Sequence, residues 1–226
     1  MKKVIVLFCG VVFIQTATCQ IDNSNILSQQ ETERIFTDSV KKTFDIQFSI
    51  FRVYAYEDIL GKHYYVLTEN FNGMSANGDS LYNKIKAFHF NIIDGVLTKK
   101  EDIFDFPNKE YYGTSISFWT RYCCFKDIDN DGLVEPIVIY GTKFGEMNEE
   151  QFWVKILVYY KGKKYAIRHH NCTLDFCRFT QIDKTFYDMP TSVQNEVKNI
   201  MRTIESHNNA YFGHWEYEMK QKTVKF

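Results

Sequence analysis

The sequence predicts a mostly β protein of the α+β class, an antiparallel sheet or sandwich of about seven or more strands with a C-terminal amphipathic helix packed on it. Segments in which apolar and polar residues alternate with period two recur along the chain, whereas one segment alone has a clear period of 3.6. The composition agrees, because 15 Tyr and 20 Phe stand against 3 Pro, which suits a chain that buries its core in strands.

The expected strands are separated by glycines and short polar turns. Asp94-Gly95 predicts a tight turn between two of them, and residues 70–83 are expected to form a polar loop. Residues 31–43 are expected to begin as a short helix. The strand segments are 44–50, 52–56, 63–68, 84–90, 96–98, 115–125, 136–140, 152–160 and 164–168.

The helical segment follows Pro190 and is expected to span residues 190–206. Thr191 and Gln194 fit a capping box at its start. Its apolar residues recur on one face, which predicts packing on the sheet; they are Val193, Val197, Ile200, Met201 and Ile204.

The N-terminus has the pattern of a secretory signal peptide, with Lys2 and Lys3 before a short apolar run. We expect residues 1–19 to be removed, 20–30 to form a flexible lead and 31–226 to form a single β-rich exported domain. Lipidation of Cys19 is the alternative to a soluble product. No later stretch has the roughly 20 apolar residues of a transmembrane helix, so the expected location is periplasmic, cell-surface or secreted.

The net charge bears on which partners the protein can bind, and the cysteines bear on whether it contains disulfides. Without Lys2 and Lys3, the 27 basic residues become 25 against 28 acidic ones, which argues against a nucleic-acid binder. In an oxidising compartment the later cysteines can pair or can fill the core; Cys172 with Cys177 is the most local bridge. The four are Cys123, Cys124, Cys172 and Cys177.

The strongest motif is the acidic stretch 127–135, which has the spacing of a calcium loop. Carboxylates stand at loop positions one, three, five and nine, and Gly132 at position six permits a sharp turn. Position twelve is Val138 rather than the Glu of an EF-hand, so we expect a loop between strands. An acidic turn without metal is the alternative. The predicted structural Ca²⁺ ligands are Asp127, Asp129, Asp131, the Leu133 carbonyl and Glu135.

A second polar group follows the last predicted strand. Paired carboxylates could serve glycoside chemistry there, but ion pairing within a polar turn is the favoured interpretation. The sequence contains no nucleophile, phosphate-loop or zinc motif, and it identifies no catalytic residue. The residues of this group are His169, His170, Asp175, Arg178 and Asp183.

Four segments in the second half resemble, in the same order, small exported proteins of Gram-negative bacteria labelled surface polysaccharide biosynthesis proteins. The segments are 126–142, 159–169, 174–178 and 183–190. The resemblance implies a link to surface polysaccharide without a defined reaction or catalytic residues. The acidic loop also resembles the calcium loops of integrin-type, FG-GAP-like β-repeat modules, although no repeat of about 40 to 60 residues recurs here.

Two functions follow as expectations. The first is an exported, calcium-stabilised module that binds or organises surface glycan, with Trp119, Trp153 and Trp215 as candidate stacking surfaces. The alternative is a glycan-acting enzyme, a hydrolase or transferase, that uses carboxylates near Asp175.

Overall fold

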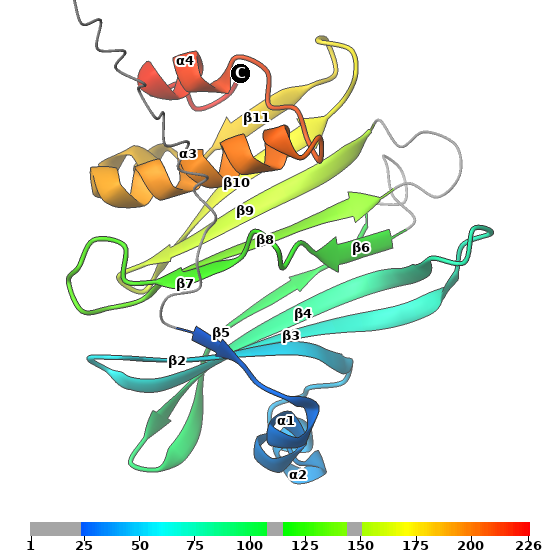
Figure 1. The fold of residues 1–226 in the computed structure, drawn as a ribbon, viewed down its shortest axis with the longest axis vertical. Coiled ribbons are helices and arrows are strands. Elements are labelled where there is room, and N and C mark those ends of the chain that lie inside the picture. Colours follow the sequence, from blue (N-terminus) through cyan, green and yellow to red (C-terminus); the bar gives the residue numbers. More distant parts are fainter. Residues whose placement is uncertain (1–23, 108–114, 144–150) are drawn as a thin grey trace, which may run out of the picture.

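The computed structural model describes residues 24–107, 115–143 and 151–226, so the predicted signal peptide lies outside the described residues. The described chain forms two antiparallel sheets, of five and six strands, in keeping with the predicted fold class (Figure 1).

The first sheet has the order β1-β2-β3-β4-β5, and each strand pairs with its sequence neighbour. The Asp94-Gly95 turn joins β4 to β5 as predicted, with both residues at positive φ. The strands are β1 (Ser24–Ile26), β2 (Ser49–Asp58), β3 (Gly61–Met74), β4 (Ser80–Ile93) and β5 (Val96–Asp105).

The second sheet has the order β11-β10-β9-β8-β6, and β7 also pairs with β8. Its strands are β6 (Ser115–Phe118), β7 (Cys124–Lys126), β8 (Glu135–Lys143), β9 (Phe152–Tyr160), β10 (Lys163–Asn171) and β11 (Phe179–Ile182). The described helices are α1 (Gln29–Ile35), α2 (Asp38–Thr43), the 3-10 helix η1 (Lys184–Asp188), α3 (Thr191–Ser206) and α4 (Trp215–Lys220).

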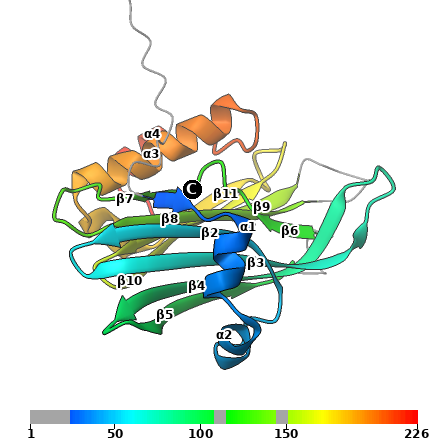
Figure 2. The same cartoon turned by 60° about the horizontal axis from the view of Figure 1, so that its bottom comes forward.

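Alternation along the strands of the first sheet produces two cores. Tyr54 and Tyr65 point toward the second sheet and join the main core, whereas Val53 and Val66 point to the opposite face. That outer face is covered by α1 and α2, with Phe36 fully buried against it. Helix α3 packs on the second sheet, so helices cover both outer faces of the sandwich (Figure 2).

Helix α3 confirms the predicted apolar face, because all five predicted residues are buried. The predicted capping box is wrong. Pro190 is the N-cap residue and makes no side-chain cap, while Gln194 Nε2 donates to the carbonyl oxygens of Tyr187 and Met189. Gln194 therefore ties the preceding 3-10 turn to the helix instead of closing the first turn.

Several predicted boundaries differ from the structure. Residues 24–30 of the predicted lead are structured, because β1 pairs with β2 and α1 begins at Gln29. Residues 44–48 precede the strand that was expected to include them, and the predicted loop 70–83 is largely the long β3–β4 hairpin. Polar residues are tolerated there because hairpin backbone groups pair with each other whatever the side chains are.

The cysteines divide into two pairs with different environments. Cys172 and Cys177 form a disulfide, with their Cα atoms 5.8 Å apart, which closes the connection between β10 and β11. Cys123 and Cys124 are buried and neither is in a disulfide. The local bridge is thus the one that forms, because five residues of separation let the chain turn back on itself.

Gly141 in β8 is a position where only glycine fits. A Cβ atom there would lie 2.6 Å from the Trp153 carbonyl oxygen and 3.0 Å from Cζ2 of Trp119. We expect Gly141→Ala to lower the free energy of unfolding by about 1–3 kcal/mol, because a strand backbone must shift to make room. Urea denaturation measures this loss. Ser117→Ala, at the residue paired with Gly141, is the control and should change stability by less than about 0.5 kcal/mol.

Candidate functional site: an acidic loop and two aromatic clefts

The acidic loop connects β7 to β8, which pair through Lys126 and Glu135 at its two ends. Asn130 and Gly132 both have positive φ, 59° and 88°, and these two left-handed residues fold the loop back on itself. A Cβ on Gly132 would also lie 2.8 Å from Cγ2 of Ile59. Glycine is therefore required here by backbone conformation and by close packing.

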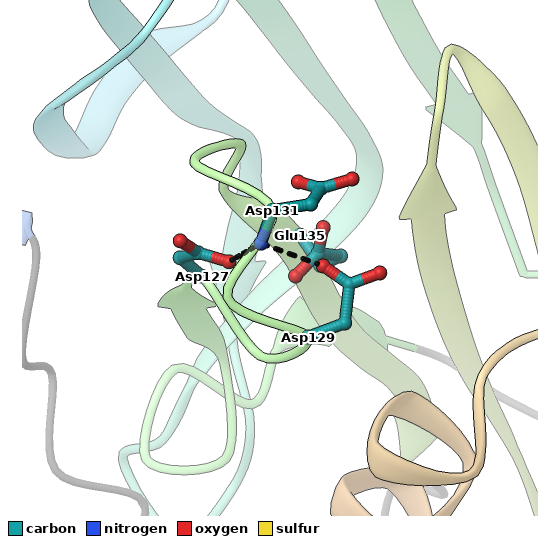
Figure 3. A group of neighbouring side chains, drawn as sticks. All are labelled: Asp127, Asp129, Asp131 and Glu135. Carbon is teal, nitrogen blue, oxygen red and sulfur yellow. Dashed lines mark hydrogen bonds between the residues drawn. The ribbon is translucent and has the colours of Figure 1, made fainter.

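The folded loop brings the four predicted carboxylates together. One oxygen from each of Asp127, Asp129, Asp131 and Glu135 lies within 4.8 Å of the others, so the cluster could hold a metal ion. Figure 3 shows these side chains and the Asp131 N–H, which donates to oxygens of Asp127 (3.1 Å) and Asp129 (3.2 Å). The loop backbone thus holds the carboxylates in place, while each oxygen keeps a further lone pair for a ligand.

Glu135 is the buried member of the cluster, with 1% of its surface exposed. Its Oε2 accepts a hydrogen bond from the Ile128 N–H at 2.7 Å. Burial, reinforced by the negative charges of the three aspartates, raises the pKa of Glu135 to about 7. The loop therefore places one carboxyl group with a raised pKa at the buried end of the acidic cluster.

The turn between β9 and β10 supplies partners to the exposed side of the loop. Lys161 Nζ lies 3.1 Å from Asp131 Oδ2, and the Tyr160 hydroxyl donates to Asp129 Oδ2 at 3.0 Å. The Leu133 N–H and Lys161 lower the pKa of Asp131. One ammonium group thus offsets part of the charge of four carboxylates, and a divalent cation would offset more.

Asp58, at the end of β2, anchors the loop to the first sheet. Its side chain is 6% exposed and accepts hydrogen bonds from the Val134 N–H (3.3 Å) and from the Leu60 N–H (2.8 Å). The Ile59 N–H donates to the Gly132 carbonyl oxygen at 3.0 Å. Sequence reasoning missed this residue, because Asp58 lies 76 positions from its partner Val134. Its one local signal was its place three residues before Gly61, the glycine of the predicted turn.

Asp58 also ends a buried polar chain within the first sheet. Its Oδ1 lies 2.9 Å from His63 Nε2, and His63 Nδ1 lies 3.2 Å from His89 Nε2. The Tyr56 hydroxyl completes the chain 2.9 Å from the same His89 nitrogen. Burial, with the neighbouring His63, lowers the pKa of His89 to about 4. This partly buried network gives the first sheet a polar core beside the end of β2, where Asp58 contacts the acidic loop.

The second predicted polar group is divided among separate pairs. His169 contacts Thr180 Oγ1 at 2.9 Å, and His170 Nδ1 lies 2.6 Å from the Cys177 carbonyl oxygen. Both histidines are buried. The remaining members form ion pairs: Asp175 with Arg178, and Asp183 with Arg168. The Asp175 side chain is 91% exposed, which fits the ion-paired turn that the sequence favoured.

The three tryptophans differ in their environments. Trp215 is 2% exposed, and its Nε1–H donates to Glu205, so the expectation that it offers a stacking surface is wrong. Burial of the apolar side of α4 removes it from solvent. Trp119 and Trp153 are partly buried, and each lines a cleft.

The two clefts lie near the ends of β8 and β9, where Thr142 contributes to both. The cleft at Trp119, here called the Trp119 cleft, has a volume of about 560 Å³. The cleft at Trp153 has a volume of about 500 Å³ and contains a hydrogen-bonded group of Asp105, Tyr140 and Lys155. Neither was placed by sequence reasoning beyond the identity of its tryptophan. The residues lining the Trp119 cleft are Asp79, Ser117, Phe118, Trp119, Thr120, Arg121, Tyr122, Thr142, Phe152, Asn208 and Asn209.

Among the described residues, no helix has the length and apolar character needed to cross a membrane. No family model, no curated protein and no solved structure matches the chain.

Proposed function

We propose that the protein is an exported module whose two sheets are locked together by a structural calcium ion and which binds surface glycan without catalysing its conversion. The observation that carries the proposal is the convergence of four carboxylate oxygens within 4.8 Å. The ion would be held by these carboxylates and by the Leu133 carbonyl oxygen.

The number of protein ligands in the cluster favours calcium over magnesium, because Mg²⁺ usually keeps several waters and is bound by one or two carboxylates. Ca²⁺ binds oxygens at about 2.3–2.6 Å, so two ligands on opposite sides of it lie up to about 5 Å apart. Mg²⁺ requires about 2.0–2.1 Å and a near-octahedral shell, which limits opposite ligands to about 4.2 Å. The four oxygens lie within 4.8 Å of one another, which is close enough for one Ca²⁺ to contact all of them. All ligands are hard oxygens, as calcium prefers.

The position of the loop supports a stabilising role. The loop is hydrogen-bonded to the β2–β3 hairpin through Asp58 and Ile59 and to the β9–β10 turn through Tyr160. An ion at the loop would fix a point at which strands of both sheets meet. Extracellular calcium modules bind at about 10⁻⁴ to 10⁻³ M, so calcium outside a cell would keep such a loop closed.

Export and glycan association are supported by the sequence, through the signal-peptide pattern of residues 1–19 and the resemblance of the second half to surface polysaccharide proteins. The two tryptophan-lined clefts supply surfaces on which sugar rings could stack. The ion pairs of Asp175 and Asp183 occupy the carboxylates that the enzymatic alternative would use.

Calcium is expected to raise the melting temperature of the protein, and Asp129→Ala is expected to abolish the rise. Binding stabilises the folded state by RT ln(1 + [Ca²⁺]/Kd), about 2.7 kcal/mol when free calcium is 100 times Kd. Asp129 contributes an oxygen to the cluster from the middle of the loop. Thermal unfolding in millimolar CaCl₂, in MgCl₂ and in chelator measures the response of each protein.

Asp38→Ala is the matched control, because it removes an aspartate whose side chain is fully exposed on α2. This variant should keep the full calcium response. Equal melting temperatures of the native protein in calcium and in chelator would show that the stretch is only an acidic turn. A response to MgCl₂ as large as that to CaCl₂ would contradict the choice of ion.

A further inference from the structure

We propose that the Trp119 cleft is the binding site for a neutral saccharide segment, with the Trp119 ring as its stacking surface. The inference rests on the proposed association with glycan and gives it a site and a ligand class. The volume of the Trp119 cleft, about 560 Å³, lies within the range of about 300–1,000 Å³ that is typical of small-molecule sites.

The aromatic wall of the cleft is held rigidly. Trp119 follows β6, and its N–H donates to the Ile139 carbonyl oxygen on β8 at 2.8 Å, while its own carbonyl accepts from the Tyr122 N–H at 2.9 Å. Its ring lies close against Gly141, where a Cβ would come within 3.0 Å of Cζ2. Because Gly141 has no side chain, the Trp119 indole can pack directly against the β8 backbone. A fixed ring loses little entropy when a ligand stacks on it.

Further aromatic rings extend this wall. The Tyr122 and Phe152 rings lie 6.2 Å and 6.1 Å from the Trp119 ring, centroid to centroid. Sugar rings carry axial C–H groups on one face and hydroxyls around the edge, so they need an apolar surface beside polar groups. The cleft combines both kinds of surface.

The polar side is built where α3 ends. Arg121 Nη2 lies 3.1 Å from His207 Nε2, and His207 Nδ1 lies 3.0 Å from the Tyr122 hydroxyl. An arginine can only donate, so Nε2 is the acceptor and the proton of the neutral ring is on Nδ1, which donates to the Tyr122 oxygen. The Asn209 amide nitrogen donates to the same oxygen. The Tyr122 oxygen therefore accepts twice, and its own proton is left to donate to a ligand in the cleft.

The charges in the cleft favour a neutral ligand. Among its described lining residues there is one acid, Asp79, and one base, Arg121, which is engaged with His207. The other polar groups are hydroxyls and amides, which both donate and accept as sugar hydroxyls do. Asn208 has a positive φ of 55° in the turn after α3, a conformation that asparagine adopts readily. An acidic glycan would instead require unpaired basic side chains.

The test is a binding assay with the full mature protein in calcium. An array of neutral hexose and N-acetylhexosamine oligosaccharides, together with uronic-acid oligosaccharides, identifies the tightest probe, which is then titrated calorimetrically. The native protein is expected to bind a neutral oligosaccharide. Trp119→Ala is expected to weaken that binding by about tenfold, which corresponds to about 1.4 kcal/mol and is the scale of an aromatic stacking contact. Trp119→Phe keeps an aromatic face and should lose less.

Tyr217→Ala is the matched control, because Tyr217 is an exposed aromatic residue on α4 that is not among the described lining residues of either cleft. It should bind the probe as the native protein does. A melting temperature close to that of the native protein, measured under the same conditions, shows that each variant is folded. Equal affinity of Trp119→Ala and native protein would overturn the assigned cleft but leave glycan binding standing. Binding of no oligosaccharide by the native protein would overturn both. A preference for uronic-acid probes would overturn the neutral ligand class.

Discussion

Replacing Asp58 with alanine is expected to lower the free energy of unfolding by about 3–5 kcal/mol, the largest loss predicted for a residue near the acidic loop. The side chain is buried and accepts from two backbone N–H groups, of Leu60 and Val134, and contacts His63 Nε2. Alanine would leave the part-buried Val134 N–H and His63 Nε2 without this partner, and each unsatisfied buried group costs about 1–3 kcal/mol. Urea denaturation measures the loss.

The same change should weaken the response to calcium, because Asp58 holds Val134 between the proposed ligands Leu133 and Glu135. Asp58→Asn keeps one acceptor oxygen and should lose less stability than alanine. Glu57→Ala is the control at the adjacent exposed position. If Asp58→Ala and the native protein unfold at the same urea concentration, the contact of Asp58 with Val134 does not stabilise the acidic loop.

Glu135→Gln is expected to stabilise the calcium-free protein at pH 8 by on the order of 3 kcal/mol and to leave it unchanged near pH 4.5. Glutamine is neutral and can accept the Ile128 N–H as Glu135 does. The folded-state pKa of Glu135 is about 7, against 4.5 as its ordinary value. Between these values the folded chain holds a proton that the unfolded chain releases. Stability from Glu135 is therefore full below about pH 4.5 and is lost as the pH rises through 7.

The difference in unfolding free energy between the two proteins is the quantity to measure, by urea denaturation in chelator from pH 4.5 to 8. Burial lowers the pKa values of His89 and His169 to about 4 and about 3, and both effects destabilise the fold as the pH falls below about 6.5. These contributions are common to both proteins and cancel in the difference. A constant difference across this range would contradict the role given to Glu135. In calcium, the glutamine variant should bind the ion more weakly, since it lacks the charge.

The sequence alone determined the parts of this protein whose residues lie close together in the chain. The clustering of the four carboxylates could be predicted because they and Gly132 fall within nine residues. The hydrogen bonds from the loop backbone to these carboxylates are equally local. Helix α3 and strand β9 could be predicted because the spacing of apolar residues and the length of a segment are local properties of the sequence. The Cys172–Cys177 bridge spans five residues.

The tertiary structure decided everything that depends on distant segments meeting. It buried Trp215, on the inner side of α4, in the main core but left Trp119 at a cleft, although the two residues have the same side chain. It placed Asp58 beneath a loop 76 residues away and raised the pKa of Glu135 by burying it there. Period-two patterns specify which side chains share a face, but not which sheet or helix covers that face. Burial, and with it charge state and ligand access, is set by that covering.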